Sequence, residues 1–283
     1  MKTNLFGFIM ALILTVTPLL ADDAQEIFNK ANEAYAKGQS LAGEQRQAEA
    51  MERFGEAARL YEEILASDFV SWPVLYNLGN AHYRQGRIGK AIVNYRRSER
   101  LAPRNPAVKA NLQQAKQQIR DRELSSDLPS FFRSLLFCYY GLNINEATTL
   151  ALSLYLIFCL CELGYIFTKH RRAKHATSVF LVLTIVSTTS LLLKFRSENH
   201  RPPGVVIAPE CPVRVGPGEE QHVLFTAHEG ADILVMEERP SDTPEKRWLK
   251  VRVLIETEER TENETRRVYG PEGYIQSPDI ELL

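Results

Sequence analysis

Histidine and cysteine, the side chains that most often bind metals or act as nucleophiles, are few in this 283-residue sequence and poorly spaced for a shared site. His170 and His175 stand five residues apart in a basic segment, while His222 and His228 stand six apart. Neither pair has partner ligands at the spacing of a zinc site. The sequence also lacks a phosphate-binding P-loop and an HExxH motif. We therefore expect a protein that is not an enzyme and that uses no metal or cofactor.

The four cysteines are too few for a disulfide framework. Cys159 and Cys161 are two residues apart in a segment predicted to be helical, so they point to different faces and cannot form one site together. Two interpretations of the cysteines stay open: small apolar packing residues or redox-sensing thiols. The net charge of -1 argues against nucleic acid as a partner.

Binding chemistry is better represented, because residues 75–103 read LYNLGNAHYRQGRIGKAIVNYRRSERLAP. Small residues such as Gly79 and Ala91 would let two helices pack closely, and Gly86 would form the turn between them. The segment resembles the tetratricopeptide repeat (TPR), a helix–turn–helix unit of about 34 residues. This resemblance implies one clear repeat over residues 72–105.

A degenerate copy precedes this repeat over residues 25–67, with Gln39–Arg53 standing where the family usually has one residue. The second half of this insertion, QAEAMERF, looks helical and would lengthen the second helix. After the clear repeat, apolar residues at helical spacing predict a cap helix over 106–122. The whole would be a short helical solenoid over residues 22–124. Because about three repeats are normally needed for stability, we expect this domain to self-associate or to pack on another protein.

TPR units bind peptides through the inner face of each first helix, so the resemblance implies a protein-binding surface there. These positions are Phe28, Asn32, Tyr76, Asn77, Asn80, Tyr83 and Arg84. Asn32 and Asn77 match the asparagines with which some TPR domains grip a C-terminal carboxylate. The positions that carry cations in those domains hold Phe28, Ala107 and Asn111 instead. Three interpretations remain: a carboxylate site, a groove for another protein ligand, or polar side chains that only shape the surface.

A basic segment at 169–175, KHRRAKH, separates two apolar runs, Ala147–Phe167 and Ala176–Leu193. Each run is about long enough to cross the roughly 30 Å hydrocarbon core as a helix, which predicts transmembrane helices over 146–168 and 176–195. Short cationic loops stay on the cytoplasmic side, so both flanking regions would lie on the other side. The cations that would set this orientation are Lys169, Arg171, Arg172 and Lys174.

The N-terminus predicts the same orientation. Lys2, an apolar stretch from Leu5 to Val16 and the small residue Ala21 follow the order of a secretory signal peptide, predicted over residues 1–21. If this segment were not cleaved, it would form a third membrane helix with the same topology. Both signals place the following soluble region outside the cytoplasm.

Several features of the membrane region allow two interpretations each. The aromatic juxtamembrane segment, residues 125–145, suits either the membrane–water interface or a packed connector. Glu162 would serve either a relay or partner contact, or pair with the basic loop. The hydroxyl side chains of the second span can bond their own backbone or permit close helix packing. Neither span has the paired charges of a transport pathway.

From Gly204 the sequence changes to short apolar runs that are broken by Pro and Gly, which fits a small β barrel. The predicted strands are Gly204–Ala208, Val213–Val215, His222–Thr226, Ile233–Glu237, Trp248–Glu256 and Val268–Ile275. The segments APECPVRVGPGEE, HEGADILVMEE, RWLKVRV and GYIQSPDIELL resemble a bacterial SH3-like domain over 201–283. The charged insertion Glu256–Arg267 would be a solvated hairpin tip.

Alternation along one predicted strand places Trp248, Lys250 and Arg252 on one face, away from the expected core. Tyr274 stands where the SH3-like family commonly has tryptophan. These four residues would contact a ligand, or Trp248 would pack within the barrel instead. The signature of proline-peptide recognition, an Ala-Leu-Tyr-Asp-Tyr run, is absent.

The order of signal peptide, TPR solenoid, two-helix transmembrane hairpin and SH3-like β barrel resembles the BatE-like proteins of the bacterial aerotolerance operon. The resemblance implies a multi-pass protein of the bacterial inner membrane with both soluble domains in the periplasm. It also implies partners among von Willebrand-type membrane proteins and a MoxR-type ATPase system, in oxygen or stress tolerance. We expect a non-catalytic scaffold for envelope proteins. The alternative is a sensor that binds peptidoglycan peptides through the SH3-like domain.

Overall fold

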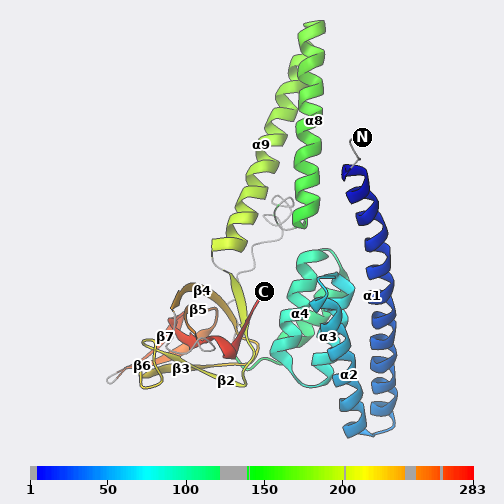
Figure 1. Cartoon of the computed structure of the whole chain (residues 1–283). Coiled ribbons are helices and arrows are strands. Elements are labelled where there is room, and N and C mark those ends of the chain that lie inside the picture. Colours follow the sequence, from blue (N-terminus) through cyan, green and yellow to red (C-terminus); the bar gives the residue numbers. More distant parts are fainter. Residues whose placement is uncertain (1–4, 122–138, 140, 201, 240–246, 262–263) are drawn as a thin grey trace. The chain divides into compact units, whose positions relative to one another are not determined.

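A helical region, two long apolar helices and an antiparallel sheet follow one another along the chain, as the computed structural model shows (Figure 1). This order confirms the three-part fold class. The structure describes residues 5–121, 139, 141–200, 202–239, 247–261 and 264–283, and it describes side chains in these ranges except at 5–22, 197–200 and 256–269. The chain divides into two compact units, Met1–Ser98 with Val108–Gln118 and Glu99–Ala107 with Ile119–Leu283, and each is described by itself.

The first unit is helical throughout its length. Its helices are α1 (Leu5–Gly43), α2 (Gln47–Ala66), α3 (Trp72–Arg84), α4 (Ile88–Leu101) and α5 (Pro106–Lys116). The signal peptide predicted at 1–21 falls where side chains are not described, and its cleavage stays a prediction. The cap helix predicted over 106–122 is α5, which ends at Lys116.

The insertion in the degenerate copy lengthens both helices of the first pair. α1 continues to Gly43 and α2 begins at Gln47, so the prediction that QAEAMERF extends the second helix is confirmed. The added turns bury a core of their own around Phe54, which is 2% exposed. Phe54 lies so close to Gly38 that a Cβ there would meet its ring at 2.8 Å. The long insertion is therefore accommodated as a packed antiparallel helix pair.

The second pair, α3 and α4, follows the pattern of the clear repeat. Pro73 occupies the first turn of α3, where its missing N–H costs nothing. Gly86 takes a φ of +76° at the turn, a conformation that glycine adopts without steric strain. The ring of Tyr95 packs against Gly79, where a Cβ would lie 2.6 Å from it. Close approach at this glycine is what brings the two helices together.

Two helices of the second unit are each long and apolar enough to cross a membrane. α8 (Ile144–Thr168) and α9 (Arg171–His200) contain apolar windows with a mean hydropathy of 2.0, of which 6% of residues are buried. A capping box formed by Asn143 and Glu146 begins α8. The basic loop predicted at 169–175 is shorter than expected, because α9 already begins at Arg171. Lys and Arg are good helix formers and nothing in the segment breaks a helix, so most of its cations lie in the first turns of α9.

Polar side chains in this helix pair bond to backbone. The hydroxyls of Thr177, Ser178 and Thr184 donate to carbonyls four residues earlier, which is one of the two interpretations of the hydroxyls in the second span. Lys194 donates to the carbonyls of Tyr139 and Leu142 just before α8. The rest of the predicted aromatic segment falls mostly outside the described residues.

The C-terminal region forms an antiparallel sheet in the order β3-β2-β8-β5-β4-β1-β9. The strands are β1 (Pro203–Val206), β2 (Glu210–Arg214), β3 (Val223–His228), β4 (Asp232–Arg239), β5 (Trp248–Val253), β8 (Glu272–Gln276) and β9 (Ile280–Leu282). A short 3₁₀ turn, η1 (Ser277–Asp279), joins the last two strands. Alternate apolar residues of these strands, among them Val213, Ile233, Val251 and Ile275, form one buried core.

Two predicted strand boundaries are wrong in an informative way. The predicted strand Val268–Ile275 is interrupted at Gly270, which has a φ of +62°, so that β7 (Glu264–Tyr269) and β8 are separate. β7 pairs with β6 (Glu256–Thr261) in a two-stranded hairpin beside the main sheet. The charged insertion is thus a β hairpin, as expected. The hairpin also includes the end of the predicted strand Trp248–Glu256 and the start of the predicted strand Val268–Ile275.

Candidate functional site

Four of the predicted inner-face residues, Asn32, Tyr76, Asn77 and Asn80, take part in two hydrogen-bonded groups, and Tyr83 and Arg84 lie outside both. In the first group, the hydroxyl of Tyr61 donates to Asn32 Oδ1 at 2.6 Å, and Asn77 Nδ2 donates to the same oxygen at 2.9 Å. Phe28 packs its ring against Tyr61, with centroids 5.9 Å apart. Burial raises the pKa of the Tyr61 hydroxyl, which keeps it protonated and able to donate.

This first group changes the interpretation of the two asparagines. A carboxylate clamp needs Asn32 and Asn77 to present their side chains to a ligand. Here the Asn32 oxygen accepts two internal hydrogen bonds, and the Asn77 amide provides one of them. With no cations at the neighbouring clamp positions, these asparagines hold α1, α2 and α3 together. These hydrogen bonds give the two asparagines a structural role in the absence of a ligand, and they leave the amide donors of Asn32 unused within the described residues.

The second group lies one turn along α3, between α3, α4 and α5. The buried hydroxyl of Tyr95 donates to Asn80 Oδ1 at 2.8 Å, and Asn111 Nδ2 donates to the same oxygen at 2.8 Å. Asn111 Nδ2 also donates to the hydroxyl of Tyr76 at 3.0 Å. Burial raises the pKa of Tyr95, so its hydroxyl stays a donor. The network fixes the position of Asn80 and occupies its acceptor oxygen.

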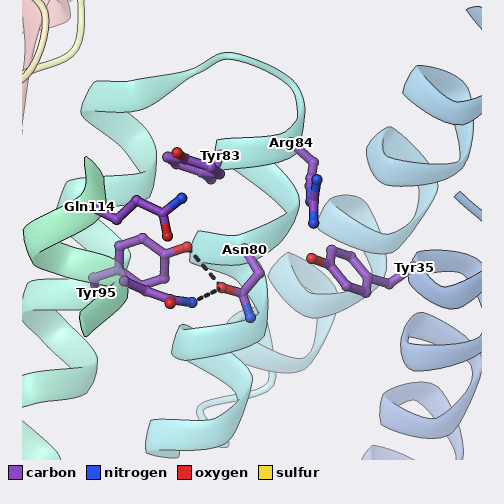
Figure 2. A pocket seen from close by; sticks show the side chains of 7 residues that line it. Tyr35, Asn80, Tyr83, Arg84, Tyr95 and Gln114 are labelled. Carbon is purple, nitrogen blue, oxygen red and sulfur yellow. Dashed lines mark hydrogen bonds between the residues drawn. The ribbon is translucent and has the colours of Figure 1, made fainter. Parts of the chain in front are cut away.

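A pocket of about 170 Å³ opens beside Asn80. Figure 2 shows Tyr35 and Arg84 directed toward one another on one side of Asn80, with Tyr83, Tyr95 and Gln114 on the other. The complete lining is Tyr35, Asn80, Tyr83, Arg84, Tyr95, Asn111 and Gln114. These residues come from α1, α3, α4 and α5, so the pocket requires both helix pairs and the cap helix.

The pocket is rich in hydrogen-bond donors and carries one positive charge. Among the described residues, Arg84 is its single ionised lining residue, and no carboxylate lines it. The side chain of Arg84 makes no hydrogen bond or ion pair with any residue that the structure describes. Its charge is therefore presented to whatever enters from solvent.

A buried histidine lies behind this surface, between α2 and α3. His82 is 2% exposed, and its Nδ1 has no hydrogen-bond partner within the described part of the chain. Its Nε2 is 3.6 Å from Glu62 Oε1, a carboxylate whose side chain is 53% exposed. Burial, helped by the charges of Lys90 and Arg87, lowers the pKa of His82 to about 4. The exposed and solvated Glu62 is too weak a partner to reverse the effect of burial.

The face predicted to contact a ligand on the sheet is only partly as expected. Trp248 is 8% exposed, so the structure covers a side chain that alternation predicts to lie away from the core. Lys250 and Arg252 lie half-exposed, but Glu272 pairs with both, at 3.5 Å from Lys250 Nζ and through hydrogen bonds from Arg252. The guanidinium of Arg239 lies over the ring of Tyr274 at 5.7 Å. Lys250 and Arg252 thus share a carboxylate partner, in contrast to Arg84 in the pocket.

The burial of Cys211 in the antiparallel sheet makes its thiol a poor nucleophile. Cys211 is completely buried in the sheet core, and burial raises the pKa of its thiol to about 12. Such a thiol is not ionised near neutral pH, which favours the packing interpretation at this position.

Comparison with known protein families adds one finding. A tetratricopeptide repeat model matches residues 72–105, which hold α3 and α4. No curated protein matches the chain significantly. The match supports a protein-interaction module in the helical region.

Sequence reasoning identified Asn80, Tyr83 and Arg84 but missed the other side of the pocket. Tyr35 and Tyr95 occupy positions typical of packing residues, and they also line the groove. Asn111 was noted only as a residue that replaces a clamp cation, and Gln114 on the cap helix was not singled out, yet both line the pocket. The sequence did contain one indication of this contact. The cap helix begins only a few residues after the repeat, so its polar face can lie next to the inner face of α3.

Proposed function

We propose that this protein is a non-catalytic, membrane-anchored scaffold that recruits other envelope proteins through the groove of its helical region. The observation that carries this proposal is the pocket beside Asn80, built from four helices around an arginine that has no ion-pair partner among the described residues. The TPR match over the helices that supply most of its lining supports a protein as the ligand.

The two apolar helices support the anchoring part of the proposal. Most side chains in their apolar windows are not covered by the chain itself, and together they expose many large hydrophobic residues such as Leu156, Phe167 and Val182. Burying such a surface in hydrocarbon is strongly favourable, whereas leaving it in water is not. With KHRRAKH in the cytoplasm, both soluble regions would lie in the periplasm.

The domain order supports a setting like that of the BatE-like proteins. The partners of this scaffold would then be von Willebrand-type membrane proteins and, through them, a MoxR-type ATPase system that responds to oxygen or another stress. Because the solenoid is short, a second copy of the chain is a further partner that would stabilise it.

Crosslinking followed by affinity purification of the intact chain tests the proposal, with cells grown under normal and oxidative conditions. Alanine at Arg84 and Gln114 should abolish recovery of the specific partners, because both side chains line the pocket. The matched control carries alanine at Arg59 and Lys109, which are exposed and do not line it. Recovery of no specific envelope protein under either condition would contradict the scaffold.

A peptidoglycan-binding sensor remains the second candidate, because Lys250, Arg252 and Tyr274 lie on the paired strands β5 and β8. We rank it lower because Glu272 forms ion pairs with both cations and Trp248 is buried. Sedimentation of the detergent-solubilised chain with purified cell wall separates the two candidates. Pelleting that is lost on Tyr274→Ala would favour the sensor, and no pelleting at low salt would remove it.

A further inference from the structure

We propose that the pocket beside Asn80 binds a carboxylate of the partner peptide and that Arg84 is the residue that selects it. This inference rests on the proposed function and names the chemical class of its ligand. It places carboxylate recognition at Arg84 rather than at Asn32 and Asn77, whose neighbouring clamp positions hold Phe28, Ala107 and Asn111 instead of cations.

First, the pocket attracts anions. Arg84 is the one ionised residue in the lining, and it has no carboxylate partner among the residues that the structure describes. An anion that enters the pocket can therefore pair with the Arg84 guanidinium without breaking an existing ion pair. A guanidinium also offers two parallel N–H groups that match the two oxygens of a carboxylate.

Second, several neutral side chains of the lining have hydrogen-bond donors available for a ligand. The oxygen of Asn80 is occupied by Tyr95 and Asn111, which leaves the Asn80 amide as its available group. The hydroxyl of Tyr83 already accepts a hydrogen bond from Gln118, so its own proton is available to a ligand. Tyr35 lines the same pocket as Arg84 (Figure 2). Acceptor-rich ligands fit such a surface better than donors do.

The single charge of the pocket favours a carboxylate over a more highly charged anion. A volume of about 170 Å³ accommodates one acidic side chain or one chain terminus. A phosphate carries close to two charges and would leave one of them uncompensated against a single guanidinium. The carboxylate comes either from a Glu or Asp side chain or from a free C-terminus, and the experiment separates these sources.

Binding of defined peptide pools to the intact, detergent-solubilised chain tests the inference. The probes are acetylated hexapeptide pools of random sequence with one position fixed as Glu or Gln, each made with a C-terminal amide or a free acid. We expect either the Glu-amide pool or the Gln-acid pool to bind about tenfold or more tightly than the Gln-amide pool, as one charge-assisted contact would provide. The first result identifies a side chain as the source, and the second identifies the terminus.

Two arginine variants complete the design. Arg84→Gln should remove the preference, whereas Arg87→Gln, the same charge change at an exposed position outside the pocket, should keep it. Equal binding of all pools by the unchanged chain would overturn the carboxylate inference and leave peptide recruitment standing. A preference that survives Arg84→Gln would overturn the role of this pocket. Failure of every pool to bind would contradict both the inference and the proposed function.

Discussion

His82 is a neutral imidazole fixed in the helical core, and this makes the stability of the helical region depend on pH. Its pKa is about 4 in the folded chain and about 6.5 in an unfolded one. The unfolded state therefore binds more protons between these values, and the stability that is fully present above pH 6.5 is lost as the pH falls toward 4. Over the whole window the loss approaches about 3 kcal/mol.

We predict that lowering the pH from 7 to 5 reduces the free energy of unfolding of the helical region by about 2 kcal/mol through His82 alone. Hydrogen exchange of α2 and α3 in the intact chain, measured at both pH values, gives this quantity. His82→Phe should remove most of the pH-dependent part, whatever constant effect it has on packing. An unchanged pH dependence in His82→Phe would show that another group is responsible.

At the level of helices and strands, two glycines in similar helices are expected to respond in opposite ways to the same substitution. Gly79→Ala places a methyl group 2.6 Å from the buried ring of Tyr95, which cannot move without disturbing α4. Overpacking of this kind costs about 1–3 kcal/mol, offset in part by about 1 kcal/mol of helix propensity. Gly55 in α2 faces open space, with no described atom of a neighbouring element within 4 Å of the place a methyl group would take. Gly55→Ala should therefore stabilise the helix by up to about 1 kcal/mol.

Hydrogen exchange of α2, α3 and α4 measures both effects in the intact chain. The expected result is faster exchange for Gly79→Ala and equal or slower exchange for Gly55→Ala. Stabilisation by Gly79→Ala would show that the two helices are not held at the close approach that the structure describes.

Elements were predictable from sequence where one periodicity continued for several turns. The clear repeat, the cap helix and both apolar helices have such patterns, and so does the alternation in β5. The ends of elements were less predictable, because they depend on single residues such as Gly270 and on helix propensity at Arg171. Alternation left two interpretations of Trp248 open, because it places a side chain on a face but does not say what covers that face. The burial of Trp248 favours packing over ligand contact.

The candidate site was half predictable for a related reason. Residues on α3 follow the known inner face of the repeat, and they were identified by position alone. The contributions of Tyr35, Asn111 and Gln114 depend on how α1 and α5 pack beside α3. That packing is long-range, and a local pattern carries no information about it.

At the scale of the whole molecule, the cations at the α8–α9 turn are predicted to set the orientation of both soluble regions. Replacing Lys169, Arg171, Arg172 and Lys174 with glutamate removes the positive charge that we propose retains the turn in the cytoplasm. We expect mixed topology, measured as lost activity of a periplasmic reporter fused after Leu283. A chain with the same number of Lys or Arg residues changed to Glu on exposed parts of the helical region serves as the control. Full reporter activity in the turn variant would show that the turn does not determine orientation.

We propose that the pocket beside Asn80 holds another protein while the chain is anchored in the membrane. Site-specific photo-crosslinking in intact cells tests it most directly, with the photoreactive residue at Gln114 on the pocket lining or at Lys109, exposed on the same helix outside it. We predict discrete adducts with envelope proteins from position 114 and none from position 109. No adduct from position 114, or the same adducts from both positions, would show that the pocket does not hold a partner protein.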